Sequence, residues 1–328
     1  MPSDLSRRAL LGLAVGLPVS AVFLWLAVRG ADLGDVRRAL EDAQVGLVGL
    51  AVLAIGLVYG IQAMRWRRIA AAPHVRLARF YEMVLTGIAC NNVLPARLGD
   101  LLRARWLARE APMPGGRGLG TVVLDRGCDL VALFTFLVIG LAAVAETAWL
   151  VRIAAGTAAV LVALGGALVF ARVYTARRSR ERRERGLVRG VVRDAAELLA
   201  EPIGRRRLAS WIALSLGAWA VWALGAVLVA RSLDIELSLV EALFVAAVMN
   251  LGVAIPSSPG FVGTYEWLGV ASLGLLEVPD EPALAFAILL HACWYVPTTL
   301  AGGTALAIRG SLRVRRARAG RSSEGTVR

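Results

Sequence analysis

Polar residues that could bind an anion surround a proline break in the first third of the chain. Arg97 follows Pro95 by two positions, and Asn91 and Asn92 come shortly before it. A guanidinium group presents a fork of donors that suits phosphate or carboxylate, and amides add neutral donors and acceptors. Helix N-termini exposed at Pro95 and Gly260 would add positive dipole ends. We therefore predict a pocket for an anionic headgroup; the alternative is that Arg97 extends to phosphates at the membrane surface.

A second break, from Pro256 to Glu266, interrupts the apolar region 239–276. Two prolines and two glycines in so short a segment cannot continue a helix. No charge lies between Glu241 and Glu266, so we place the break at membrane depth, where protein or a water-filled cavity must cover its backbone. A broken helix with an ionisable residue is typical of transporter sites. Glu266 could pair with Arg97 or bind a cation or a proton; the alternative is a loop between two ordinary spans.

Further candidate residues lie on two other apolar segments. Asp125, Arg126 and Asp129 fall within one helical turn, and Arg126 and Asp129 are neighbours on one face because they are three positions apart. This pairing either contributes to the site or only neutralises the start of a span. His291 and Tyr295 are four positions apart and could face the same site, although His291 is also compatible with simple packing.

The composition indicates an integral membrane protein. The chain has 328 residues, 58% of them hydrophobic, and a mean hydropathy of +0.65, whereas soluble proteins are about 45–50% apolar. The net charge of +13 comes without any lysine, and the arginines cluster between apolar runs, which indicates positive-inside topology rather than nucleic-acid binding. The three cysteines have no paired spacing, and the two histidines are too few for a histidine-rich centre. We expect no metal, no cofactor and no enzyme activity.

Eight apolar segments predict an all-α, polytopic fold with about six full spans and two broken or re-entrant hairpins. The predicted spans are 10–28, 45–64, 121–145, 149–173, 208–230 and 282–308, and the predicted hairpins are 80–109 and 239–276. The arginine distribution places both termini in the cytoplasm. The two hairpins then enter from opposite sides of the membrane, as the halves of an inverted repeat would.

The connecting segments complete the predicted organisation. Residues 1–309 form one transmembrane domain, and residues 310–328 form a basic cytoplasmic tail that we expect to be disordered. Residues 29–44 are predicted as an external loop, 65–79 as a basic cytoplasmic loop, and 112–120 as a link rich in glycine and proline. The basic cytoplasmic loop 174–207 contains an amphipathic helix at 187–201. This helix either lies on the inner leaflet or binds a protein partner.

Three motifs in this chain resemble those of a known family. Residues 91–103 read Asn-Asn-Val-Leu-Pro-Ala-Arg-Leu-Gly-Asp-Leu-Leu-Arg, residues 124–129 read Leu-Asp-Arg-Gly-Cys-Asp, and residues 256–266 read Pro-Ser-Ser-Pro-Gly-Phe-Val-Gly-Thr-Tyr-Glu. In this order they resemble the motifs of the lysylphosphatidylglycerol synthase transmembrane-region family, also called the flippase-like domain or UPF0104 family. Asp100 and Asp125 stand where glutamate is commoner, and Phe261 stands where the family has a second glycine.

The resemblance implies a module that binds or moves lipid-linked anions across the bilayer. Together with the chemistry above, it gives the candidate headgroup-binding residues Asn91, Asn92, Arg97, Asp100, Arg103, Arg126, Asp129, Pro259, Gly260, Gly263, Tyr265, Glu266, His291 and Tyr295. The full synthase carries a soluble aminoacyl-transferase domain after its membrane part, and this chain ends with a basic tail instead, so we do not expect lipid aminoacylation.

We therefore expect a flippase-like transporter of the bacterial plasma membrane. Its substrate would be an anionic phospholipid or a polyprenyl-phosphate-linked lipid, and nucleic acid would not be a partner. One alternative is a membrane glycosyltransferase or an accessory subunit of polyprenyl-linked sugar transfer. Another is a lipid-binding scaffold that does not transport.

Overall fold

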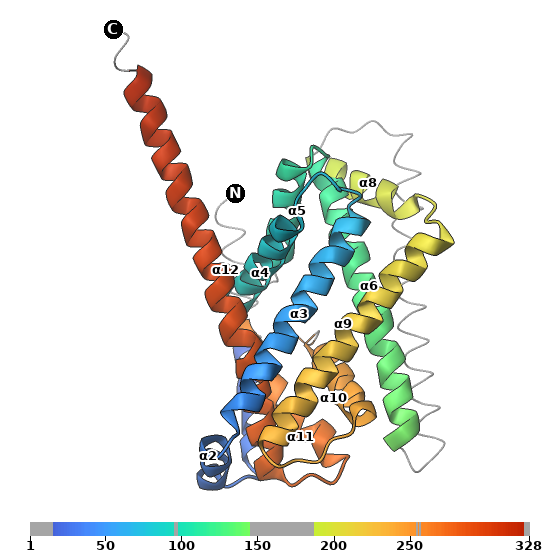
Figure 1. The fold of residues 1–328 in the computed structure, drawn as a ribbon, viewed down its shortest axis with the longest axis vertical. Coiled ribbons are helices and arrows are strands. Elements are labelled where there is room, and N and C mark those ends of the chain that lie inside the picture. Colours follow the sequence, from blue (N-terminus) through green and yellow to red (C-terminus); the bar gives the residue numbers. More distant parts are fainter. Residues whose placement is uncertain (1–15, 95–97, 145–186, 254, 256, 325–328) are drawn as a thin grey trace.

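The structure is a computed structural model that describes residues 16–94, 98–144, 187–253, 255 and 257–324. Every regular element among these residues is helical (Figure 1), which confirms the predicted all-α class. In chain order they are the helix Gly16–Val28, α2 (Leu33–Glu41), α3 (Val45–Ile69), α4 (Leu77–Val93), α5 (Leu98–Glu110), α6 (Gly115–Val144), α8 (Leu187–Ala200), α9 (Arg205–Ser232), α10 (Leu239–Gly252), the 3-10 helix η2 (Pro259–Phe261), α11 (Thr264–Gly274) and α12 (Asp280–Glu324).

Three of the described helices are long and apolar enough to cross a membrane: α3, α9 and the part Asp280–Arg309 of α12. The shortest has 25 residues, or about 37 Å of helix, against a hydrocarbon core of about 30 Å. The helix Gly16–Val28 and α2 would together make a fourth, but they are bent by 83° at the break between them. The chain is therefore an integral membrane protein. The predicted span 149–173 lies outside the described residues.

Both predicted hairpins consist of helices too short to cross the membrane alone. Helices α4 and α5 have 17 and 13 residues, and α10 and α11 have 14 and 11. Helices α4 and α5 run antiparallel and touch closely, because a Cβ on Gly99 would lie 1.9 Å from the carbonyl oxygen of Gly87. Figure 1 shows α4 and α5 toward one end of the bundle and α10 and α11 toward the other. The hairpins thus approach the interior from opposite ends.

Two predicted loops contain helix instead. The loop 29–44 includes α2, whose start is capped by the Asp32 carboxylate accepting a hydrogen bond from the Gly34 N–H at 2.7 Å. The link 112–120 includes the first turns of α6, where glycines permit close helix packing. A Cβ on Gly116 would lie 2.2 Å from the Val191 carbonyl oxygen of α8, and a Cβ on Gly118 would lie 2.6 Å from a carbonyl oxygen of α5.

The two predicted cytoplasmic elements also differ from expectation. The amphipathic helix is present as α8, but Ala195, Ala196 and Leu198 on its apolar face are buried, and the helix packs on α6 rather than lying only on lipid. Helix α12 continues to Glu324, where we expected a disordered tail from residue 310. Five arginines, two alanines and a leucine lie between residues 310 and 324, and these residue types favour helix.

The helix Gly16–Val28 packs against the break between α10 and α11. Its Ser20 hydroxyl accepts a hydrogen bond from the Ser258 N–H at 2.8 Å. A Cβ on Gly16 would lie 2.6 Å from the Ser257 carbonyl oxygen, so the absence of a side chain there allows the close approach. Gly16 and Ser20 are four positions apart and so lie on one face of this helix. That face covers the non-helical backbone of the break between α10 and α11, which must be shielded from lipid.

Candidate functional site

Arg65 of α3 is the centre of a group of buried charges. Its guanidinium group donates to Asp125 Oδ1 at 2.8 Å and to Asp129 Oδ1 at 2.7 Å. A third bond, of 2.5 Å, reaches the Ser215 hydroxyl of α9. The predicted basic loop 65–79 is therefore wrong at its first residue, because α3 continues to Ile69 and Arg65 is fully buried among the aspartates of α6.

Arg103 of α5 occupies the other side of Asp125. It donates to Asp125 Oδ2 at 3.1 Å, and its guanidinium carbon lies 4.3 Å from the centre of the Trp66 ring, within cation–π range. The indole N–H of Trp219 on α9 donates to Asp129 at 2.9 Å. Both aspartates are therefore held by charged or polar donors from several helices, which fixes how α3, α5, α6 and α9 pack.

A third arginine, Arg126, completes what we call the charged cluster, which consists of Arg65, Arg103, Arg126, Asp100, Asp125 and Asp129. Arg126 donates to Asp100 at 3.0 Å and lies 3.7 Å from Asp129. Arg103 also lies 3.6 Å from Asp100. The cluster has three arginines and three aspartates, so its formal charge is balanced within the helices that contain it. Pairing of opposite charges lowers the free-energy cost of placing ionised side chains within the membrane.

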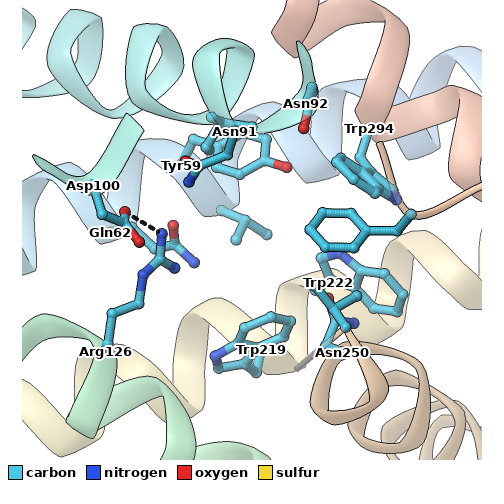
Figure 2. A pocket seen from close by; sticks show the side chains of 14 residues that line it. Tyr59, Gln62, Asn91, Asn92, Asp100, Arg126, Trp219, Trp222, Asn250 and Trp294 are labelled. Atoms are coloured by element: carbon cyan, nitrogen blue, oxygen red, sulfur yellow. Dashed lines mark hydrogen bonds and ion pairs between the residues drawn. The ribbon is translucent and has the colours of Figure 1, made fainter. Parts of the chain in front are cut away.

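A cavity of about 140 Å³ lies beside the charged cluster (Figure 2). Arg126 and Asp100 form one wall, and the Arg126 side chain is 38% exposed. The rest of the wall combines three aliphatic side chains with aromatic rings and amides: Val58, Ile88, Val253, Tyr59, Trp219, Trp222, Phe261, Trp294, Gln62, Asn91, Asn92 and Asn250. Rings can pack on the apolar faces of a ligand while amides offer both donors and acceptors.

The cavity is where the three sequence motifs meet. Asn91, Asn92 and Asp100 come from the first motif, Arg126 from the second and Phe261 from the third. The amides are also anchored to the protein. The Asn91 side-chain oxygen accepts from the Gly99 N–H at 2.8 Å, which joins α4 to α5. The Asn92 amide donates to the Thr299 hydroxyl of α12 at 2.8 Å.

Glu266 lies in a separate polar group on α11 and α12. Its Oε1 is 2.5 Å from His291 Nδ1, and its Oε2 accepts from the Gly263 N–H at 2.6 Å. Tyr265, Trp294 and Tyr295 surround the imidazole, with ring centroids 4.6, 5.0 and 5.4 Å away. Arg97, which we considered as one possible partner of Glu266 beside a cation or a proton, lies outside the described residues.

The backbone before Glu266 adopts conformations that favour glycine. Gly260 has φ 78° and Gly263 has φ 86°. A Cβ on Gly260 would lie 2.8 Å from the Tyr295 ring, and one on Gly263 would lie 2.3 Å from the Ser20 carbonyl oxygen. Pro259 begins η2 between the two longer helices. These residues therefore shape the helix break.

The candidate residues identified from the sequence fall into three places. Asn91, Asn92, Asp100 and Arg126 line the cavity. Arg103 and Asp129 lie in the charged cluster behind it. The third group forms the break and its surroundings: Pro259, Gly260, Gly263, Tyr265, Glu266, His291 and Tyr295.

Several cavity residues were missed by sequence reasoning. Trp219 and Trp222 are three positions apart on α9, and this spacing on an apolar helix was the available signal. Arg65 could have been found from the need of Asp125 and Asp129 for a cation. Single polar residues such as Gln62 and Asn250 carry no comparable signal, because their neighbours come from other helices.

Membrane-length helices around two opposed, broken hairpins and a polar cavity define an integral membrane protein with an internal site. A model of the family described as Lysylphosphatidylglycerol synthase TM region matches residues 10–302. The chain belongs to this family, which confirms the resemblance of its three motifs.

Two curated proteins are similar to this chain. Glycosyltransferase AglD of Haloferax volcanii is 28% identical over 346 residues, which cover 92% of this chain and 55% of the relative. UPF0104 membrane protein MJ1595 of Methanocaldococcus jannaschii is 28% identical over 130 residues, which cover 38% of this chain and 39% of the relative. The chain thus matches about half or less of the length of these relatives.

Proposed function

We propose that this protein binds the phosphate-containing headgroup of an anionic lipid in the cavity and moves it across the membrane without catalysing a reaction. The observation that carries the proposal is the meeting of all three motifs at one polar cavity between hairpins from opposite ends of the bundle. Half-span helices that meet in this way are a recurrent basis of alternating access in transporters. An anionic phospholipid and a polyprenyl-phosphate-linked lipid share the phosphate chemistry that this site would recognise.

Arg126 is the cation best placed to hold the phosphate. It lines the cavity with its side chain 38% exposed, whereas Arg65 and Arg103 are 0% and 2% exposed. A phosphate that contacts Arg126 would compete with Asp100 for the same guanidinium group. Arg103, 3.6 Å from Asp100, would then remain as a partner for that carboxylate. Headgroup binding would therefore replace the Arg126–Asp100 ion pair while each of the three aspartates keeps a contact with an arginine.

Lipid movement in vesicles tests this proposal. The purified protein is placed in phosphatidylcholine vesicles that contain acyl-labelled phosphatidylglycerol or, in a second set, a labelled polyprenyl phosphate. A membrane-impermeant quencher reports the movement of the label between leaflets. We expect Arg126→Gln to lower the rate about tenfold or more, because a hydrogen bond to a charged group contributes about 1.5–3 kcal/mol.

Arg117→Gln is the matched control. Arg117 is also on α6, its side chain is 41% exposed, and its ion pair with Glu201 lies away from the cavity. We expect this variant to move lipid at the wild-type rate. The proposal would be contradicted if wild type and Arg126→Gln moved both labelled lipids between leaflets at equal rates. The lipid that the wild-type protein moves faster would identify the headgroup class.

A second candidate function is sugar transfer to or from a polyprenyl-linked lipid. Two observations favour it: one similar protein is named a glycosyltransferase, and the cavity wall combines three indoles with four amides, a lining suited to a sugar ring. Incubation of the purified protein with a polyprenyl-phosphate-linked sugar and an acceptor lipid distinguishes the two. Formation of a newly glycosylated lipid would favour this function. Movement of labelled lipid between leaflets with no new glycosylated lipid would favour transport.

A further inference from the structure

The two groups of buried ionisable residues differ in their charge balance. In the charged cluster three arginines face three aspartates. Glu266, by contrast, is 6% exposed and pairs with the 6% exposed His291, and no arginine in the described part of the chain forms an ion pair with it. With a neutral imidazole this pair has a net charge of −1, and with an imidazolium it is neutral. Uptake of one proton therefore removes an uncompensated buried charge.

Among the described residues, His291 is the only ionisable side chain that forms an ion pair with Glu266. Tyrosines and cysteines on the helices packed around this pair are ordinarily neutral at pH 7: Tyr59 on α3, Cys90 on α4, Tyr265 on α11, and Cys293 and Tyr295 on α12. The helix Gly16–Val28 contains no titratable residue. Charged side chains on these elements are engaged elsewhere: Arg65 in the charged cluster, Glu82 with Arg309, Glu241 at the start of α10, Glu281 at the start of α12, and Arg37 with Glu41 on α2.

The imidazole itself has a position at which to accept this proton. With Nδ1–H donating to Glu266, the buried Nε2 of His291 has no hydrogen-bond partner among the described residues. Tyr265, Trp294 and Tyr295 place their rings around the imidazole.

We propose that Glu266 and His291 form a proton-binding site to which lipid movement is coupled. A proton from one aqueous side binds at His291 Nε2, the pair becomes neutral, and the proton leaves to the other side when the pair returns to a net charge of −1. This inference rests on the proposed function for its cargo, but the proton site can be tested without any lipid movement.

The pair is linked to the cavity through two short paths. Trp294 stacks on His291 at 5.0 Å between ring centroids and also lines the cavity. On the other side, Glu266 holds the Gly263 N–H, and Phe261 of the same break lines the cavity. Gly260 and Gly263, both at positive φ, lie between these contacts. A change in the charge of the pair therefore acts directly on residues that contact a bound headgroup.

Nuclear magnetic resonance of the histidine ring tests the proton site directly. The chain has two histidines, and His74 is exposed. In the His74→Gln protein every histidine signal therefore comes from His291. With ¹⁵N-labelled histidine, we expect the ring to change from the neutral to the doubly protonated form as the pH is lowered through the range in which the protein stays folded. A ring that stays neutral across this range would overturn the proposal, whatever the protein does to lipid.

Vesicles with an imposed pH gradient test the coupling. Labelled phosphatidylglycerol in phosphatidylcholine vesicles is followed with gradients of both signs, with and without a protonophore. We expect wild type and His74→Gln to differ at least about threefold between the two signs, and we expect His291→Gln and Glu266→Gln to show no difference. The protonophore should remove the difference in the first two proteins.

The outcomes separate the two proposals. If the wild-type protein moves lipid at the same rate under both signs of the pH gradient, the proposed coupling is overturned and the proposed transport function stands. Absence of lipid movement in wild type under every gradient would overturn the transport function and with it the coupling, while the histidine titration would still decide whether the proton site exists.

Discussion

At the scale of single residues, the structure separates arginines by their surroundings rather than by their position in the sequence. Arg65 and Arg67 are two positions apart in α3, yet Arg65 is completely buried between two aspartates while Arg67 turns toward the Pro73 carbonyl near the surface. A buried charge that loses its partner is left uncompensated at low dielectric, so the residues of the charged cluster should be far more sensitive to substitution than other arginines.

Arg65→Met should lower the free energy of unfolding by about 3–5 kcal/mol, because it leaves Asp125 and Asp129 without their shared donor. Thermal unfolding of the purified protein in detergent measures the effect. Arg37→Gln is the control, since the Arg37–Glu41 pair is 78% and 57% exposed and exposed pairs contribute about 0.2–1 kcal/mol. A loss for Arg65→Met as small as for the control would show that the buried bonds do not stabilise the fold.

At the scale of elements, the break between α10 and α11 depends on backbone conformations and on contact with the first helix. Gly263 precedes α11 with φ 86° and ψ −53°, a region that residues with a Cβ rarely occupy. The same glycine leaves room for the Ser20 carbonyl oxygen. The break is therefore specified by both local conformation and tertiary packing, which is why proline and glycine marked it so clearly in the sequence.

Gly263→Ala should destabilise the protein by at least about 1–3 kcal/mol, the cost of a strained backbone position, with a further penalty from the contact with Ser20. Gly274→Ala, at the other end of α11, is the matched control because a Cβ there meets nothing within 4 Å. Thermal unfolding of the two variants under identical conditions checks the difference. Equal midpoints for the two alanine variants would show that the break tolerates a side chain.

At the scale of the whole molecule, the two hairpins lie toward opposite ends of the bundle (Figure 1), and the arginine distribution predicts which end faces the cytoplasm. Leu77 begins α4 and is 41% exposed, and Leu275 follows α11 and is 65% exposed. They lie at the entrances of the two hairpins. The three native cysteines are buried and unpaired, which makes single introduced thiols easy to distinguish.

Leu77→Cys should react with a membrane-impermeant maleimide only from the cytoplasmic side, and Leu275→Cys only from outside, as the arginine distribution predicts. Labelling of intact cells and of inverted vesicles measures this. Wild type, with its buried cysteines, gives the background. Modification of both positions from the same side would contradict hairpins that enter from opposite faces.

The sequence predicted the architecture more completely than the cavity. Long apolar runs identify membrane helices by themselves, and the proline and glycine clusters near 95 and 256–266 interrupt them visibly. Charge patterns were less informative, because Arg65 looked like the start of a basic loop until α6 supplied its aspartates from 60 and 64 positions away. Tertiary packing alone brings together Gln62, Trp222 and Asn250 at the cavity. No local sequence pattern predicts that these residues are neighbours.

The contact between Ser20 and Ser258 joins positions 238 apart in the chain, and this separation has a consequence for biosynthesis. At a synthesis rate of about 5–20 residues per second, the first helix waits roughly 12–50 s before its partner segment leaves the ribosome. During that interval the face that carries Gly16 and Ser20 lacks the partner it has in the folded protein. A nascent chain halted before residue 258 therefore cannot form this contact, and the break between α10 and α11 is covered by this helix only after most of the chain has been made.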